Sequence, residues 1–109
     1  MPYIKVRTNV EIKDKERLKK LLGKVITTIP GKEEWMTAIS LEEKADMYFG
    51  GSSSPCAVVD TLVNAGTDHS KNADYGEAVV RMLSSELDIP RNRIYVIVQE
   101  QDFWYAVSK

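Results

Sequence analysis

The sequence predicts an α+β fold in which duplicated β-α-β units form a four-stranded mixed sheet with two helices on one face. Two observations predict it. The alternating and apolar segments follow the order strand, helix, strand, and this order then repeats. The pair that ends the first predicted helix, Ile29-Pro30, recurs at the end of the second as Ile89-Pro90. Such an internal repeat indicates two similar units, and 109 residues suit one domain spanning residues 1–109.

The first predicted unit opens with a strand and a helix. Residues Tyr3–Val10 place apolar or β-branched side chains at every second position, which is typical of a strand. Apolar residues then recur at steps of three and four from Leu18 to Ile29, so one face of a helix is apolar. Asp14 is the expected N-cap. We expect the helix to end at Ile29, because Pro30 disfavours helical geometry in the residue before it.

The middle of the chain completes this unit. Residues Trp35–Leu41 form the expected second strand, followed by a charged turn at residues 42–46. A short extended piece is expected at Met47–Phe49. The glycines, serines and proline of residues 50–55 then indicate a loop.

The second unit repeats the pattern. Cys56–Val63 is a largely apolar strand, and residues 64–72 are a polar connection. An amphipathic helix runs from Tyr75 to Leu87, and Arg93–Gln99 is a final strand. A short aromatic tail follows at residues 103–107. Both crossovers are expected to be right-handed, as crossovers between parallel strands almost always are.

One face of this sheet has no helix to cover it. Four strand residues cannot all point toward the helices: Val58, Ile94, Val96 and Val98. We therefore expect an uncovered apolar face that is buried between copies of the chain or against a ligand, with the first favoured. The alternative is a face lined mostly by polar side chains such as Lys5 and Arg7.

Composition excludes several classes of function. The chain carries 15 Lys and Arg against 16 Asp and Glu, so it lacks the basic surface expected of a binder of nucleic acid or of an anionic membrane. The single cysteine, Cys56, and the single histidine, His69, argue against an internal disulfide and against a metal site. No apolar run suggests a membrane span, and the start of the chain resembles no signal peptide, so we expect a cytoplasmic protein, with leaderless secretion as the alternative.

Two residues are candidates for chemistry. Removal of Met1 would leave Pro2 with a free secondary amine at the head of an apolar strand. Burial and a nearby cation such as Lys32 would bring the pKa of that amine toward neutrality, where a general base works best. Lys32 itself could hold a carboxylate where helix gives way to strand. The alternatives are that Met-Pro is simply a common start and that Lys32 is a solvated loop lysine.

Other motifs give weaker evidence for a function. Gly50–Ser54 lacks the lysine of a phosphate-binding loop and is read as a turn. Cys56 is read as a small core residue. His69 stands in a polar loop without evident partners. Arg91 and Arg93 precede the last strand, where they either bind an anion or are solvated.

Several of these features, taken in order, resemble the macrophage migration inhibitory factor family of the tautomerase superfamily. The match extends over roughly residues 2 to 98. Its carriers are Met1-Pro2 with Thr8-Asn9-Val10, Gly31-Lys32, Phe49-Gly50-Gly51-Ser52-Ser53 with Pro55-Cys56-Ala57, and Asp88-Ile89-Pro90 with Arg93-Ile94-Tyr95.

The resemblance implies an isomerase, a cofactor-free keto–enol tautomerase acting on α-keto acids of the phenylpyruvate or dopachrome type. It implies Pro2 as the catalytic base and Lys32 as the group that binds the substrate carboxylate, assisted by the backbone at Asn64. It also implies a homotrimer with active sites between subunits, in which Tyr95 of a neighbour closes the pocket near Pro2.

This chain departs from the family pattern in four places. Ile97 stands where the family commonly has Asn, so the pocket should be more apolar. Residues Val63–Gly66 replace a Ser-Ile-Gly motif, which makes the backbone donors of that loop less certain. Val59 replaces the second cysteine of a dithiol motif, which argues against thiol oxidoreductase activity. The tail at residues 103–109 is short, and we expect it to contribute to the subunit interface and the pocket wall.

Two other functions stay open from sequence. One is a cytokine-like or host-interaction protein that binds a receptor and has vestigial catalysis. The other is a ferredoxin-like module that binds RNA or a small ligand, because many functions share β-α-β repeats. The RNA version is disfavoured, because Arg93–Val96 lacks the glycine of an RNA-binding strand motif and the net charge is −1.

Overall fold

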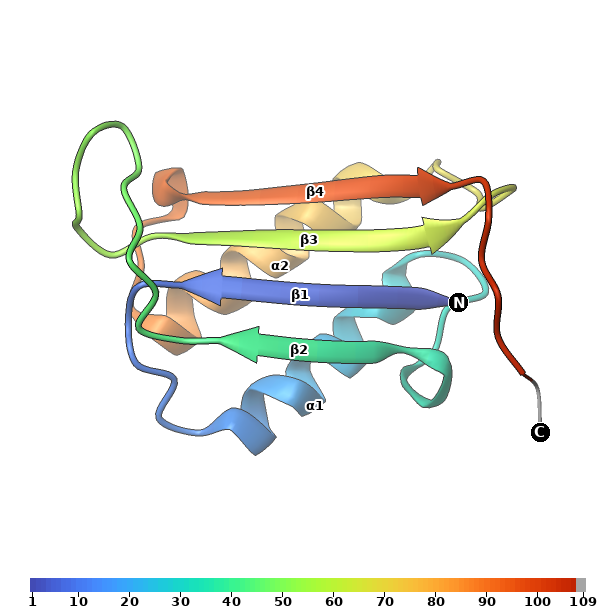
Figure 1. The fold of residues 1–109 in the computed structure, drawn as a ribbon, viewed down its shortest axis with the longest axis horizontal. Helices are drawn as coiled ribbons and strands as arrows, with labels where there is room; N and C mark the ends of the chain where they lie inside the picture. The colour runs from blue at the N-terminus through green and yellow to red at the C-terminus, as the bar shows by residue number, and fades with distance from the viewer. Residues whose placement is uncertain (108–109) are drawn as a thin grey trace.

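The computed structural model describes residues 1–107, which form a four-stranded mixed sheet with both helices packed on one face (Figure 1). The strand order is β2-β1-β3-β4, which confirms the predicted fold class. The strands are β1 (Pro2–Thr8), β2 (Ala38–Glu42), β3 (Ala57–Asn64) and β4 (Ile94–Gln101), and the helices are α1 (Lys15–Val25) and α2 (Asn72–Leu87). No helix within residues 1–107 is long and apolar enough to cross a membrane.

The pairing of the strands shows the internal duplication directly. Strand β1 is parallel to β2, and β3 is parallel to β4, so each pair is joined by one helix. The two units meet where β1 and β3 run antiparallel, with Pro2 opposite Val63 and Thr8 opposite Ala57. The amino-terminal end of β1 therefore lies beside the carboxyl ends of β3 and β4, which is where the candidate site is found.

The core lies between the sheet and the two helices, as the periodicity predicts. Asp14 caps α1, because its side chain accepts a hydrogen bond from the backbone N–H of Arg17. Alternate strand residues meet residues spaced by three or four on the helices. The fully buried set includes Ile4, Val6, Leu18, Leu22, Val59, Tyr75, Val79 and Leu83. Cys56 is buried and free, as expected for a small core residue.

The segment between α1 and β2 differs from the prediction. Helix α1 ends at Val25, and a 3₁₀ turn at Ile26–Thr28 carries the chain to Ile29, because β-branched residues suit a helix poorly. Trp35 is not a strand residue: it lies in a second 3₁₀ turn, Glu34–Met36, and is 78% exposed. The hydroxyl of Thr37 closes that turn by donating to the Glu33 carbonyl at 2.6 Å, so β2 starts only at Ala38.

The segment Met47–Phe49, predicted to be a short extended piece, forms no strand of the sheet. Phe49 pairs only with Ser52 across a tight turn, in which the two backbones exchange hydrogen bonds of 2.9 and 3.2 Å. Gly50 and Gly51 occupy the middle of the turn with φ of +60° and +80°. These positive φ angles lie in the left-handed region, which favours glycine because it has no Cβ, so glycine suits both positions.

Arg93 holds this loop, which corrects its reading as an anion-binding or solvated residue. Its guanidinium donates to four backbone carbonyls at 2.9–3.1 Å: those of Phe49, Ser52, Ser54 and Pro55. Asn9, the residue after the end of β1, binds the same loop, and its side-chain oxygen accepts from the Cys56 N–H at 2.9 Å. The predicted strand Tyr3–Val10 therefore ends at Thr8, since Asn9 turns out of the sheet to make these bonds.

The helix-free face of the sheet is more polar than the sequence suggests. Ile94, Val96 and Val98 belong to the helix side, where they contact the core. Val58 points the other way, together with the basic side chains of Lys5 and Arg7. This open face therefore carries both apolar and charged side chains. The expected apolar face and the alternative polar face are each right in part.

A buried hydrogen bond between α2 and β3 gives a direct test of the packing. The hydroxyls of Tyr75 and Thr61 lie 2.7 Å apart and both residues are fully buried. Burial raises the pKa of Tyr75 to about 12. Replacing Tyr75 with Phe orphans the Thr61 hydroxyl, so we expect the free energy of unfolding in urea to fall by about 1–3 kcal/mol.

The double variant Tyr75→Phe/Thr61→Val removes both partners and should recover much of that loss. The control, Tyr105→Phe, changes an exposed residue and should shift stability by less than about 0.5 kcal/mol. A Tyr75→Phe protein as stable as the parent would contradict this account of the core.

Candidate active site

The start of β1 is the centre of the candidate site. Pro2 is the first residue of the strand and is buried. Met1 precedes it, and the amino-terminal amine donates a hydrogen bond of 3.0 Å to Asn64 Oδ1 at the end of β3. The antiparallel pairing of β1 with β3 causes this proximity, because it sets Pro2 opposite Val63, the neighbour of Asn64.

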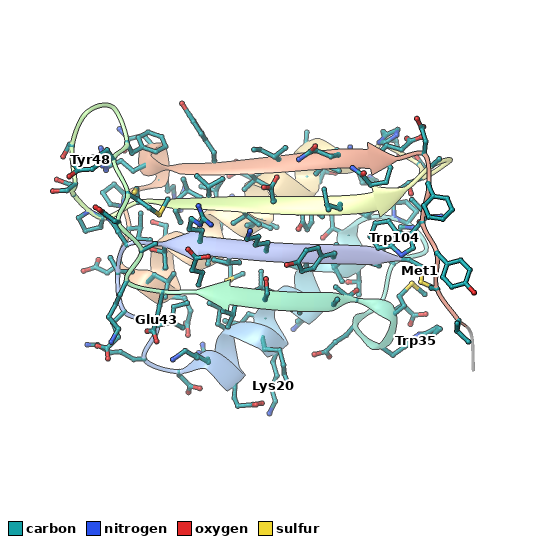
Figure 2. The ribbon with its side chains drawn as sticks, in the orientation of Figure 1. Met1, Lys20, Trp35, Glu43, Tyr48 and Trp104 are labelled. Atoms are coloured by element: carbon teal, nitrogen blue, oxygen red, sulfur yellow. The ribbon has the colours of Figure 1, made fainter. Side chains whose placement is uncertain are left out.

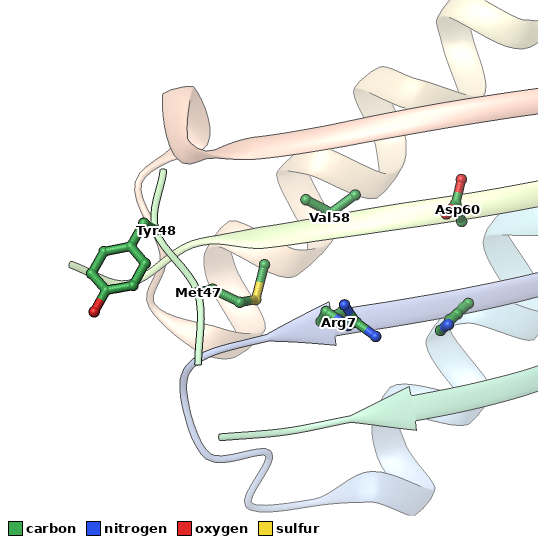
Figure 3. Close-up of a pocket in the computed structure, with 6 residues that line it drawn as sticks. Arg7, Met47, Tyr48, Val58 and Asp60 are labelled. Carbon is green, nitrogen blue, oxygen red and sulfur yellow. The ribbon is translucent and has the colours of Figure 1, made fainter. Parts of the chain in front are cut away.

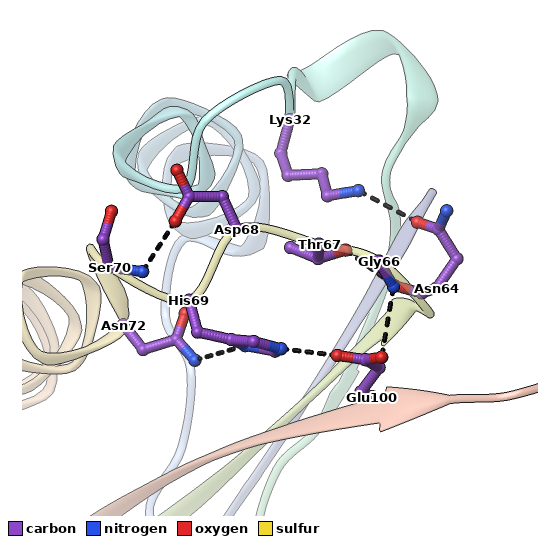
Figure 4. Close-up of polar contacts among 9 residues, drawn as sticks. All are labelled: Lys32, Asn64, Gly66, Thr67, Asp68, His69, Ser70, Asn72 and Glu100. Carbon is purple, nitrogen blue, oxygen red and sulfur yellow. Dashed lines mark hydrogen bonds and ion pairs between the residues drawn. The ribbon is translucent and has the colours of Figure 1, made fainter.

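Lys32 reaches the same place from the crossover that follows α1. Gly31 turns the chain with a φ of +80°, and the Lys32 N–H donates to the Ile29 carbonyl at 3.1 Å. The side chain of Lys32 is only 9% exposed, and its Nζ donates to Asn64 Oδ1 at 2.9 Å (Figure 4). Lys32 is therefore not a solvated loop lysine.

Among the described residues, Lys32 also lacks a counter-charge. Within residues 1–107, no carboxylate lies within ion-pair distance of its Nζ. Burying an ammonium without an anionic partner is costly, because the neutral amide oxygen of Asn64 replaces only part of its hydration. A carboxylate arriving from outside would supply the missing charge, so the arrangement suits an anionic ligand.

The amino-terminal amine is electrostatically tuned by these neighbours. Its pKa falls from the ordinary 8.0 to about 6, first because partial burial desolvates the amine and second because the Lys32 ammonium disfavours another positive charge. At pH 7 the amine is therefore largely neutral and can accept a proton. Between about pH 6 and 8 the unfolded chain holds that proton and the folded chain does not, so this amine makes stability rise with pH across that window.

The loop after β3 fixes Asn64. Its backbone carbonyl accepts from the Thr67 hydroxyl at 2.6 Å, and the Gly66 N–H donates to Glu100 Oε1 at 3.1 Å. The resemblance implies a role for the backbone of Asn64, whereas here the side-chain oxygen contacts both the amine and Lys32. Sequence reasoning missed this side-chain contact.

His69 has partners that the sequence did not reveal, which corrects its reading as an isolated residue. Its Nε2 contacts Glu100 Oε2, and its Nδ1 accepts from the Asn72 amide at 3.1 Å (Figure 4). The Gly66 N–H and then His69 lower the pKa of Glu100. This network ties the loop after β3 to β4 beside the candidate site.

Tyr95 and Ile97 lie away from Pro2 in the same chain. Tyr95 pairs with Val58, which stands opposite Arg7, so it is displaced from Pro2 by five positions, or about 16 Å, along the strands and lies two strands away across the sheet. Tyr95 is 60% exposed and its ring lies 4.6 Å from that of Phe49, centre to centre. Ile97 is beside Asp60. Of the five candidate residues, one chain brings together only Pro2, Lys32 and Asn64.

Aromatic side chains also gather at the amino-terminal end of β1. Figure 2 shows Trp35, Trp104 and Met1 at this end of the sheet. The tail that carries Trp104 leaves β4 and crosses the sheet end without regular structure (Figure 1). Trp104 is half-buried while its neighbours are exposed. The tail thus reaches the candidate site, although Ser108 and Lys109, included in the sequence prediction for the tail, lie outside the described residues.

A separate hollow lies on the open face of the sheet, toward the other end of β1 (Figure 3). Its volume is about 280 Å³, and it is lined by Lys5, Arg7, Met47, Tyr48, Val58 and Asp60. Arg7 is already paired with Glu42 at 2.9 Å. Pro2 and Lys32 do not line this hollow, so it is distinct from the candidate site.

Comparison with known proteins identifies the family. The duplicated β-α-β arrangement, a four-stranded mixed sheet with two helices on one face, is the fold of the tautomerase superfamily. The profile of the family described as macrophage migration inhibitory factor (MIF) matches residues 1–105, and the chain belongs to this family.

Curated relatives include the macrophage migration inhibitory factor homolog of Brugia malayi, 34% identical over 98 residues, and the macrophage migration inhibitory factor of Xenopus laevis, 32% identical over 98 residues. Each alignment covers 88% of this chain and 84% of the relative.

Solved structures share the fold. The crystal structure of Leishmania major MIF2 matches with a TM-score of 0.83 at 24% identity, covering 95% of this chain and 93% of that one. The homologue from Prochlorococcus marinus matches with a TM-score of 0.76 at 27% identity, covering 89% of this chain and 86% of that one.

Proposed function

We propose that this protein is a cofactor-free keto–enol tautomerase for α-keto acids of the phenylpyruvate type, with the amino-terminal proline as general base. The observation that carries the proposal is the buried Lys32 ammonium, without a carboxylate partner in residues 1–107, beside a partly desolvated amino terminus. Membership of the MIF family supports the same reaction class.

The chemistry follows from a neutral amine and a fixed cation. While Met1 is present, the Pro2 nitrogen is an amide and cannot act as a base. After Met1 is removed, the neutral secondary amine of Pro2 takes a proton from the carbon next to the keto group. The C–H electrons then form the C=C bond while the carbonyl electrons move to oxygen. The protonated amine returns its proton to that oxygen, so the enol forms with no net change in the protein.

Lys32 supplies orientation rather than proton transfer in this scheme. Its ammonium binds the substrate carboxylate and thereby fixes the reacting carbon near the amine. The aromatic residues at the same end of the sheet, Trp35 and Trp104, suit an aromatic substituent on the substrate (Figure 2). Proton transfer between carbon and oxygen needs neither an electron carrier nor a metal ion, so the proposal includes no cofactor.

A complete site on this proposal requires neighbouring copies. Tyr95 and Ile97 present partly exposed side chains on the open face, far from Pro2 of their own chain. We place this face against neighbours in a homotrimer, where Tyr95 reaches the next subunit's proline and Ile97 makes the pocket wall apolar. The exposure of these two side chains supports the arrangement, because a sheet with one uncovered face gains most by burying it.

The first prediction concerns the base. Intact mass should show that the mature protein lacks Met1, and Pro2→Gly should lower kcat for phenylpyruvate about 10²-fold or more, the range that a general base contributes. The variant keeps a free amine but replaces the rigid, secondary amine of proline with a flexible primary amine. Full activity in a preparation that retains Met1 would contradict the assignment.

The second prediction concerns Lys32. Lys32→Ala should raise KM for the free acid more than for its methyl ester, because only the acid carries the charge that the ammonium binds. Lys20→Ala, which removes an exposed lysine from α1, is the matched control and should leave both values unchanged. An equal effect of Lys32→Ala on acid and ester would count against the carboxylate contact.

The third prediction concerns assembly. Light scattering should give three chains per particle, and dilution to dissociation should abolish turnover. Pro2→Gly and Tyr95→Ala proteins, each weak alone, should regain activity when refolded together, since some mixed interfaces then pair an intact proline with an intact tyrosine. A monomer with full activity would refute the shared site.

A further inference from the structure

One oxygen atom at the candidate site receives two donors. Asn64 Oδ1 accepts a hydrogen bond of 3.0 Å from the amino-terminal amine and one of 2.9 Å from Lys32 Nζ. An amide oxygen has two lone pairs, so these two donors saturate it. They also fix the orientation of the carboxamide, because the Nδ2 group is a donor and must turn away from both.

In the part of the chain that the structure describes, no charged side chain accepts from Lys32 in place of Asn64. The nearby acidic residues are Glu100 of β4, which accepts from the Gly66 N–H and contacts His69, and Asp68 of the loop, which accepts from the Ser70 N–H at 2.8 Å. Neither forms an ion pair with Lys32. Within residues 1–107, the neutral Asn64 oxygen is thus the only side-chain acceptor recorded for either donor.

The neutrality of this acceptor affects both Lys32 and the amino-terminal amine. A carboxylate in its place would neutralise Lys32 and compete with an incoming substrate carboxylate. It would also hold a proton on the amine, which must be free to act as a base. An apolar residue would leave the Lys32 ammonium without its hydrogen bond and free to move. A carboxamide avoids both problems, because its oxygen accepts hydrogen bonds without neutralising the Lys32 charge.

We propose that Asn64 is a positioning residue, whose carboxamide oxygen holds the carboxylate-binding Lys32 beside the amino-terminal end of β1 without neutralising its charge. This inference rests on the proposed function. Removal of Met1 draws the amine back by one residue, about 3.8 Å along β1. The bond from Lys32 to Asn64 does not involve Met1, and the Thr67 and Gly66 bonds hold the loop that carries Asn64.

The test compares three substitutions in the mature protein. Asn64→Asp is nearly isosteric and adds a negative charge, Asn64→Leu removes the acceptor, and Asn64→Gln keeps the carboxamide. Asn92→Asp is the matched control, because it adds the same charge at an exposed position before β4, at the far end of the sheet. Circular dichroism and urea unfolding establish that each variant is folded.

The first readout is titration of the Pro2 amine by nitrogen NMR, which does not depend on activity. The groups that face the amine are Lys32 from the crossover and, beyond Asn64, His69, Asp68 and Glu100. We expect Asn64→Asp to raise the titration midpoint by about one pH unit or more, because an opposite charge favours the ammonium. Asn64→Leu should lower the midpoint, and Asn64→Gln and Asn92→Asp should lie near the parent.

The second readout is the ratio of KM for phenylpyruvate to KM for its methyl ester. Asn64→Asp should raise this ratio about tenfold, because the new carboxylate occupies Lys32, and Asn64→Gln should restore it. The inference would be overturned if Asn64→Asp and Asn92→Asp had the same titration midpoint. It would also be overturned if Asn64→Asp and Asn64→Leu shifted the midpoint in the same direction. The expected order of midpoints in a protein that does not enolise phenylpyruvate would support the positioning by Asn64 and contradict the proposed function instead.

Discussion

The buried ammonium of Lys32 is the constraint on which the rest of the site depends. Within residues 1–107 it has a neutral amide oxygen and no carboxylate as its side-chain partner. Its positive charge is therefore not neutralised, and it affects the ionisable groups that lie beside it. One neighbour is the Met1 amine, whose pKa it helps to lower to about 6. The other is the space where the proposed substrate carboxylate would lie. One unneutralised charge thus supports both parts of the proposal, a Pro2 amine that is free at neutral pH once Met1 is removed and a substrate that carries a carboxylate.

The sheet register brings this charge to the amino terminus. Because β1 runs antiparallel to β3, the first residue of the chain's first strand meets the end of β3, where Asn64 stands. The contacts of Glu100 with Gly66 and His69 then hold the following loop against β4. At the opposite end, Arg93 binds four carbonyls of the loop before β3. Both ends of the two central strands are thereby fixed, and the amine is placed on a rigid element rather than on a flexible tail.

Sequence patterns predict the elements well and the long-range polar contacts poorly. Spacing alone located both helices, because burial repeats every three or four residues along them. Residue type and position made Pro2 and Lys32 candidates for chemistry, and the family resemblance supplied the roles proposed for them. Spacing misplaced Trp35 in a strand, because the closure of its turn by Thr37 leaves no periodic signal. The pairing of His69 with Glu100 spans 31 positions, and the contact of Asn64 with Lys32 spans 32, so no local pattern encodes them.

The most direct measurement is the titration of the amino-terminal amine in the mature, folded protein, compared with the same amine in the urea-unfolded chain and in folded Lys32→Met. The account predicts that folding lowers the titration midpoint and that Lys32→Met, which keeps the side-chain volume without the charge, returns it part of the way toward the unfolded value. A midpoint equal in the folded and unfolded protein, or unaffected by the loss of Lys32, would contradict the claim that this buried charge prepares the amine to act as a base.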